Sequence, residues 1–417
     1  MSVNQIDVRD HRGPLYASVP IAILLWATGI LFLAVKIVPV DVYWISYYAV
    51  DYTFGFVRRG LAGEIVSLAP DGYYFDAAIA MRWVSTGVYL VSLAAVMGLV
   101  LFRGQRSERK MMLAWLIPVL PFAIPFSLYS ARPDLFGAAT LVALGISLTF
   151  VKTPRYAMAC CAAYGCLAAV LGLIHEAIAL EFSFGAILAV LVLAGGLTPA
   201  VQRRCVLLAI GPGLAIALLV AVFGRHDIGP KLCSVVPHRT MENPLATVTS
   251  FPRLMDYVFT AQRSQTDYHD WVCRNVLPIY NYSITGAMKV VAGIGVVPLL
   301  TSFVFGLLAL AVTVYSIAHF SGVSLSSFLR PLQGRPAWPA FGLVLMIPVF
   351  LTGFDWTRWL IIISFNIVIV YILYALGRPE LDEKPTNKTV QAFVLLVAAL
   401  ALIPIGTVPG FGGPHMV

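Results

Sequence analysis

An acid and two adjacent arginines stand close together in an aromatic-rich stretch near the start of the chain. Asp51 is followed by Arg58 and Arg59 within Asp-Tyr-Thr-Phe-Gly-Phe-Val-Arg-Arg-Gly-Leu, residues 51–61. A carboxylate can take a proton from a reacting hydroxyl, and the planar guanidinium fork binds two phosphate oxygens at once. On a helix, Asp51 and Arg58 would share a face because they are seven positions apart. The stretch predicts a general base beside a phosphate clamp; the alternative is a local ion pair that anchors an interfacial helix.

Three further clusters place ionisable side chains at the ends of apolar runs, where such groups are costly and tend to be functional or paired. They are Arg132 with Asp134, His175 with Glu176, and Asp355 with Arg358. Each also has a structural alternative. Asp134 could be a plain helix N-cap. His175 and Glu176 could form a hairpin-turn pair, and the cluster of Asp355 with Arg358 could be a tryptophan-anchored interfacial turn.

The functional interpretation assigns these clusters to one site. Arg132 and Arg358 are further candidate phosphate ligands. His175 and Glu176 are a candidate catalytic pair that points into a cavity, in which His175 carries or donates a proton to a leaving phosphate. Asp134 and Asp355 are supporting acids beside these arginines. Glu181 is a further acid, about one helical turn deeper than His175 and Glu176. We expect it to pair inside the helix bundle, since an unpaired charge there would be costly.

The composition predicts the fold class. The chain has 417 residues, of which 59% are hydrophobic and 12% charged, whereas soluble domains carry about 25% charged residues. Apolar runs of about twenty residues recur throughout. We therefore expect an all-α, polytopic integral membrane protein. It would form a single transmembrane domain over residues 1–417, with about 11 transmembrane helices and interfacial helices on the outer side. The formal charge of +8 does not indicate nucleic-acid binding, because Lys and Arg accumulate in cytoplasmic loops.

Charge patterning predicts the topology. Short basic loops, such as residues 103–110, 152–155 and 202–204, all fall on one predicted side, which identifies it as cytoplasmic. The N-terminus would then lie inside, the C-terminus outside, and all four mixed-charge clusters outside. The first outer loop, 39–76, and the long outer loop, 224–289, become the predicted site-forming elements.

The long loop has features of its own. Leu254, Tyr257, Val258 and Ala261 repeat at helical spacing and predict a short amphipathic helix on the membrane. His269 is a candidate supporting residue, and the scattered His and Asp residues around it are weak signals. Cys233 and Cys273 could pair if the loop faces an oxidising compartment.

Several other functions receive no support from the sequence. It contains no phosphate-binding GxxxxGK[ST] loop, no GxGxxG, no GxSxG and no metal-spaced Cys/His motif. No internal repeat indicates a two-fold transporter architecture.

The architecture and the placement of these motifs resemble the GT-C fold class of polytopic glycosyltransferases, over most of the chain. The Phe-Gly-Phe-Val-Arg-Arg-Gly-Leu and Asp-Trp-Thr-Arg-Trp runs also resemble runs in bacterial membrane proteins of surface-polysaccharide pathways. The resemblance implies a polyprenyl-phosphate sugar donor, a glycan or lipid-linked acceptor, surrounding membrane lipid, and an active site on the periplasmic side of the bacterial inner membrane. It also implies a catalytic acid just after the first span.

Two acids fit that place. Asp41 lies nearer the span end, and Asp51 has the better local electrostatics; we favour Asp51, with Asp41 second. The first loop has no Asp-x-Asp or Glu-x-Asp, so no metal ligand is assigned and a divalent metal stays an open question.

Two other functions remain as alternatives. An O-antigen or capsule polymerase or ligase would share the lipid-linked donor and differ in acceptor and product. A transporter or flippase of a lipid-linked or anionic substrate would place ionisable residues at mid-membrane and show repeat symmetry. A purely structural subunit would leave the four clusters on one side unexplained.

Overall fold

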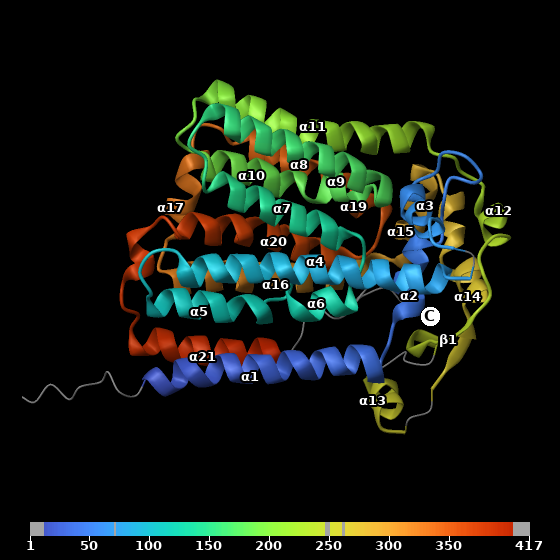
Figure 1. Cartoon of the computed structure of the whole chain (residues 1–417), viewed down its shortest axis with the longest axis horizontal. Helices are drawn as coiled ribbons and strands as arrows, with labels where there is room; N and C mark the ends of the chain where they lie inside the picture. Colours follow the sequence, from blue (N-terminus) through green and yellow to red (C-terminus); the bar gives the residue numbers. More distant parts are fainter. Residues whose placement is uncertain (1–11, 71, 247–250, 261–262, 403–417) are drawn as a thin grey trace, which may run out of the picture.

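The computed structural model describes residues 12–70, 72–246, 251–260 and 263–402. Most of these residues are helical, and the longer helices run roughly parallel to one another (Figure 1). This confirms a largely helical membrane protein. The helices long and apolar enough to cross a bilayer are α1 (Arg12–Phe32) continued by η1 (Leu33–Ile37), α4 (Tyr74–Phe102), α5 (Glu108–Leu116) continued by η3 (Ile117–Val119) and α6 (Ile124–Tyr129), α8 (Pro154–Ile174), α11 (Pro199–Phe223), α16 (Val296–Ser321) and α20 (Trp356–Ala375).

The predicted count of about eleven spans is not confirmed. Among the described residues, 7 helices are long and apolar enough to cross, or up to 8 if one helix pair bent by 98° forms one span. That pair joins α17 (Leu325–Leu329) and η6 (Arg330–Leu332) to α18 (Ala337–Val344) and α19 (Ile347–Thr352). The other expected spans coincide with shorter helices: α7 (Asp134–Leu148), α9 (Ala177–Glu181) with α10 (Ser183–Leu193), and α21 (Asn387–Leu402). The predicted end of the last span, at residue 405, lies outside the described residues.

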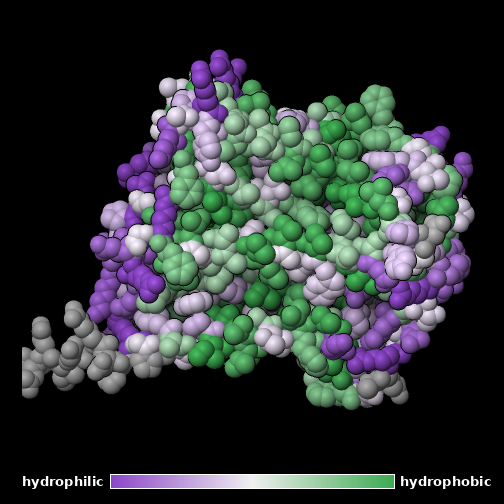
Figure 2. All heavy atoms as spheres, viewed as in Figure 1, coloured by the Kyte–Doolittle hydropathy of each residue, from purple (hydrophilic) through white to green (hydrophobic). Residues whose placement is uncertain are grey.

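Two of the crossing helices lie inside the bundle and the others around it. In α20, 94% of the best apolar window is buried, against 17% in the first helix. A helix with apolar side chains all round can be buried in this way. The face drawn in Figure 2 is apolar in its middle, with hydrophilic rims at both ends, as expected for a surface that faces lipid between two aqueous layers.

Residues 39–76 and 224–289, the two predicted outer loops, fold together into a cap at one end of the bundle (Figure 1). Buried aromatic side chains from both loops share one hydrophobic cluster, which includes Trp44, Tyr48, Tyr268 and Tyr280. The cap elements are α2 (Asp41–Ile45), η2 (Ser46–Tyr48), α3 (Gly60–Ser67), α12 (Gly229–Cys233), β1 (Thr240–Glu242), η4 (Pro244–Ala246), α13 (Phe251–Thr260), β2 (Gln265–Asp267), α14 (Tyr268–Asn275), η5 (Leu277–Asn281) and α15 (Ile284–Ile294).

The cap departs from the predicted all-α class in one respect. Strands β1 and β2 pair antiparallel, with Thr240 opposite Asp267 and Glu242 opposite Gln265. A disulfide joins Cys233 to Cys273. The predicted amphipathic helix corresponds to α13, although Ala261 lies outside the described residues.

The basic loops meet at the opposite end of the bundle. Arg12 pairs with Glu108 at 2.8 Å, and Lys110 pairs with Asp382, in η7 (Pro379–Asp382), at 2.8 Å. Since α4 has 29 residues, it separates the two ends by about 43 Å at 1.5 Å per residue. The charge asymmetry seen in the sequence is therefore an asymmetry between two ends of the molecule.

Candidate functional site

Three of the predicted clusters converge on one buried ionic network. Arg132, in the turn before α7, holds Asp355 with a distance of 2.6 Å between Nη1 and Oδ2. Arg358, in the first turn of α20, lies 3.3 Å from the same Oδ2 through Nε and also contacts Asp134, the first residue of α7. The Nδ1 of His175 lies 2.9 Å from Oδ1 of Asp134. Side chains that lie far apart in the sequence thus contact one another directly.

Glu181 extends this network into the bundle, as expected. Its Oε1 lies 3.7 Å from Nη1 of Arg358, and its side chain is fully buried. Among the described residues, neither of its carboxylate oxygens has a hydrogen-bond partner. A buried carboxylate with free acceptor capacity is costly, which marks the inner end of the network as a place where a further donor would be stabilised.

The fourth cluster joins through the neighbour of His175. Arg59 grips Glu176 with two hydrogen bonds of 3.1 Å each, and Nη1 of Arg58 lies 3.7 Å from the same carboxylate. These side chains are 15–27% exposed, whereas the inner network is nearly solvent-free. Arg59 adopts a left-handed backbone with φ 64, which is uncommon for a residue with a side chain. Two guanidinium groups therefore converge on one anion at an accessible position.

A short aromatic segment, formed by α2 and η2, lies between the two arginine groups. The ring of Tyr47 is 5.4 Å from the guanidinium of Arg59, 5.8 Å from that of Arg132 and 5.9 Å from the imidazole of His175. The hydroxyl of Tyr43 accepts a hydrogen bond of 3.3 Å from Arg132. This part of the first loop, residues 41–48, therefore forms a wall that links the accessible arginines to the buried ones.

Asp41 opens the same short helix and pairs with a residue that the sequence reasoning missed. Its Oδ1 lies 3.3 Å from Nε of Arg82, which is buried inside α4 and donates to the carbonyl of Leu128 at 3.1 Å. Burial raises the pKa of Asp41, and the neighbouring arginine opposes this rise only in part. The carboxylate remains 27% exposed. A reachable carboxylate with a raised pKa is a better proton acceptor than an ordinary aspartate.

The expected helix face shared by Asp51 and Arg58 is wrong. Residues 51–58 form turns and bends, with Gly55 at φ 102, so the seven-residue spacing brings no two side chains together. Instead, Oδ1 of Asp51 accepts a hydrogen bond of 2.9 Å from the backbone of Thr53. Among the described residues, no ion pair joins Asp51 to an arginine. Both arginines instead contact Glu176, which lies 117 positions after Arg59 in the sequence.

Charge and burial fix the protonation states around the accessible pair. The neighbouring arginines hold the pKa of Glu176 well below its usual range, although burial opposes this. Burial and the nearby Arg59 lower the pKa of His175, although Asp134 opposes them. At neutral pH the imidazole is therefore uncharged. Arg132 and Arg358 hold the pKa of Asp355 below its usual range against its burial.

His269, predicted as a supporting residue, lies elsewhere. It is in α14, on the disulfide side of the cap, where its ring contacts His238 and Asp270. One sequence signal points to the missed residue Arg82, which is the single charge inside the apolar run 77–102. Nothing in the sequence alone paired it with Asp41.

A family model described as "Uncharacterised membrane protein Rv1490" matches residues 16–401. "Uncharacterized protein Rv1490" of Mycobacterium tuberculosis is 42% identical over 410 residues, which cover 98% of this chain and 94% of that protein. "Uncharacterized protein Mb1527" of Mycobacterium bovis matches with the same identity and coverage. No solved structure matches.

Proposed function

We propose that this chain, which belongs to the family of the uncharacterised membrane protein Rv1490, is a membrane glycosyltransferase of the GT-C type. It would transfer a sugar from a polyprenyl-phosphate donor to a glycan or lipid-linked acceptor. The reaction would take place on the periplasmic face of a bacterial inner membrane, in the cap formed by the first and long outer loops.

The observation that carries the proposal is the convergence of Arg58 and Arg59 on one carboxylate. Glu176 offers two oxygens to the arginine pair and is 23% exposed. A phosphate presents the same geometry with more charge, and arginine forks bind it in the same bidentate manner. The pair lies where the apolar helices reach the cap, so a polyprenyl tail could lie along those helices in the lipid while its phosphate replaced Glu176.

The reaction follows from the charges around this position. The acceptor hydroxyl oxygen attacks C1 of the sugar, the bond between C1 and the phosphate oxygen breaks, and the polyprenyl phosphate leaves with the electron pair. Arg58 and Arg59 stabilise the charge that develops on the leaving group. The acceptor proton passes to a carboxylate of the first loop. Asp41 is the preferred base because of its raised pKa and its exposure, and Asp51 becomes the second candidate.

The affinity for undecaprenyl phosphate tests whether Arg58 and Arg59 bind the phosphate. Substitutions of the arginines and of Glu176 should change this affinity in opposite directions. Arg58→Gln and Arg59→Gln should each weaken binding roughly 10–100-fold, because each removes a charged hydrogen-bond donor worth about 1.5–3 kcal/mol. Glu176→Gln should tighten binding, because it removes the anion that competes for the fork. The matched control is Arg274→Gln, an exposed arginine of the cap, which should have no effect. Weaker binding in Glu176→Gln would contradict a shared phosphate position.

Transfer itself is tested with purified protein, a panel of radiolabelled polyprenyl-phosphate sugars and a glycan acceptor. We expect Asp41→Asn to abolish sugar transfer while undecaprenyl phosphate still binds. Asp51→Asn should retain sugar transfer. The reverse result would assign the base to Asp51. Movement of intact donor across proteoliposomes without a new glycosidic bond would replace the transferase with a flippase. Formation of a polymer from lipid-linked repeats would identify a polymerase.

A further inference from the structure

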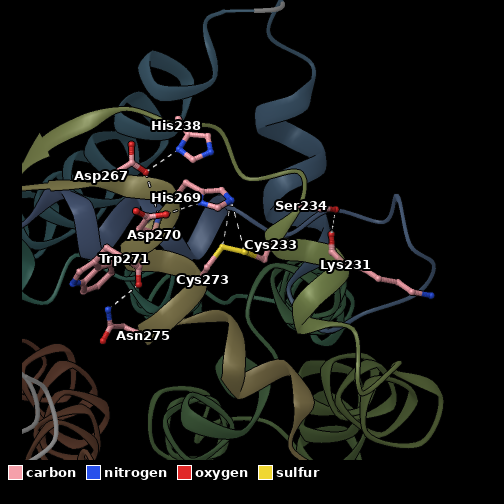
Figure 3. Close-up of a disulfide and its surroundings, with 10 residues drawn as sticks. All are labelled: Lys231, Cys233, Ser234, His238, Asp267, His269, Asp270, Trp271, Cys273 and Asn275. Carbon is pink, nitrogen blue, oxygen red and sulfur yellow. Dashed lines mark hydrogen bonds and ion pairs between the residues drawn. A yellow bond between two sulfur atoms is a disulfide. The ribbon is translucent and has the colours of Figure 1, made fainter.

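A second cluster of titratable side chains lies in the cap, apart from the arginine network, and we propose that it binds one divalent transition-metal ion of the zinc class. The cluster consists of His238, Asp267, His269 and Asp270 (Figure 3). One ligand atom from each residue lies within 4.8 Å of all the others. This metal site does not depend on the proposed sugar transfer.

Two separate chain segments are fixed together so that these side chains meet. Strand pairing places Thr240 opposite Asp267, and the backbone amide of Tyr268 donates to the carbonyl of Arg239 at 2.9 Å. His238 precedes β1, while His269 and Asp270 open α14. The disulfide ties α14 to α12 beside them. Because the framework is held on both sides, an ion binding here would have little ordering cost.

The contacts within the cluster are those of a site made for a cation. The Nδ1 of His238 lies 3.1 Å from Oδ1 of Asp267, and the Nδ1 of His269 lies 3.1 Å from Oδ1 of Asp270. The two imidazole rings stack with centroids 4.0 Å apart and an interplanar angle of 21°. Two imidazolium ions stacked at this distance would repel each other. One divalent ion can instead be shared by both rings and both carboxylates.

The opposite edge of one imidazole already has a partner. The Nε2 of His269 lies 3.7 Å from both sulfur atoms of the disulfide. A proton on Nε2 directed at these weak acceptors leaves Nδ1 as the ligand atom, on the side of Asp270. Metal-binding histidines commonly have their second nitrogen engaged in this way, which fixes the tautomer and the ring orientation.

The donor set selects the class of metal. Two imidazole nitrogens with two carboxylates are typical Zn²⁺ ligands, whereas Ca²⁺ and Mg²⁺ prefer oxygen ligands throughout. Cys233 and Cys273 are joined as a disulfide and do not act as thiolate ligands. The side chains of His238 and Asp270 are 68% and 66% exposed, so an ion can enter from solvent.

The buried face of α14 packs against the rest of the cap, so an ion bound at the start of this helix would affect the cap. Tyr268 is fully buried and shares a hydroxyl hydrogen bond of 3.1 Å with Tyr74. The ring of Trp271 lies 6.1 Å from that of Tyr43, in the wall of the arginine site. An ion bound at the start of α14 would therefore stabilise the position of the cap next to the arginine site.

The test uses the full chain in detergent, without reductant, after removal of any histidine tag and of bound metal by chelation. Calorimetry with ZnCl₂ and elemental analysis after dialysis should give one ion per chain, and Co²⁺ should give the absorption bands of a site with nitrogen and oxygen ligands. The double variant His238→Ala/His269→Ala should lose more affinity than the roughly 10–100-fold that follows loss of an outer-sphere partner.

The controls separate a specific site from unfolding. His226→Ala changes another exposed histidine of the same loop and should bind Zn²⁺ like the wild type. The single variant His238→Ala changes an exposed side chain, so it should fold, yet its melting temperature should no longer rise with ZnCl₂. Equal Zn²⁺ affinity in the double variant, or no ion retained by the wild type, would overturn the proposal and leave two surface His–Asp hydrogen bonds.

Discussion

At the scale of single residues, the candidate site is a near-balanced set of charges whose members depend on one another. The inner members Arg132, Asp134, Asp355 and Arg358 are each at most 7% exposed. Removing one partner of such a pair leaves an unpaired charge and costs roughly 3–5 kcal/mol. The outer pair of Arg59 with Glu176 is partly hydrated, so its exchange for a ligand costs far less. The network is therefore rigid inside and exchangeable at its rim.

His175 should make stability depend on pH. Its folded-state pKa is lowered by burial and by Arg59, while the unfolded value is about 6.5. Below that value the unfolded chain takes up the proton more readily, so stability is complete above about pH 6.5 and falls as the pH falls. We expect the melting temperature in detergent to drop between pH 7 and 5. In His175→Asn, whose side chain is polar but does not titrate in this range, this slope should flatten. An unchanged slope would show that another group is responsible.

At the scale of elements, small residues bring helices together. A Cβ atom added at Gly165, in α8, would lie 2.1 Å from the carbonyl oxygen of Leu208, in α11. Gly98, in α4, has nothing within 4 Å of the same position. Membrane helices commonly use small residues at such close contacts.

These two glycines form a matched test. Gly165→Ala should force α8 and α11 apart and destabilise the protein by about 1–3 kcal/mol. Gly98→Ala should be neutral or stabilising by up to about 1 kcal/mol, because alanine is the better helix former. Thermal unfolding in detergent measures both. Equal effects of the two substitutions would mean that the contact between α8 and α11 does not limit stability.

The elements also show what the sequence could and could not predict. Apolar runs predict where most of the long helices lie, because lipid and helix interior both demand apolar side chains, but they do not predict which of these helices are long enough to cross a bilayer. The ends of runs identified Arg132, His175 and Arg358 because charges there stand out. Partners were harder to predict: the sequence placed Arg58 with Asp51 seven residues earlier, but the turn at Gly55 breaks the helix that this pairing required. Pairing across more than 100 residues, as between Arg59 and Glu176, depends on tertiary packing that no local pattern encodes.

The two ends of the protein should face different compartments. Single cysteines at Thr53 or Ser283, both exposed in the cap, and at Gln105, exposed at the basic end, would report this. In a background that lacks the four free cysteines, a membrane-impermeant maleimide should label the first two in intact cells. Gln105→Cys should react only after permeabilisation, because short basic loops are typically cytoplasmic. Labelling of Thr53→Cys and Gln105→Cys from one side would contradict a cap opposite the basic loops.

The burial of α20 has a consequence for how the protein is made. The helix is enclosed by others that are mostly synthesised before it, and it carries Arg358, with Asp355 immediately before it. Ribosomes deliver the chain from its N-terminus, so Arg132 and Asp134 enter the membrane with their strongest partners still unmade. Helix α20 must then pack among helices that already carry these charges. The network can therefore be completed only after residues 355–358 have been made, and a chain cut short before residue 355 would leave Arg132 and Asp134 without these partners.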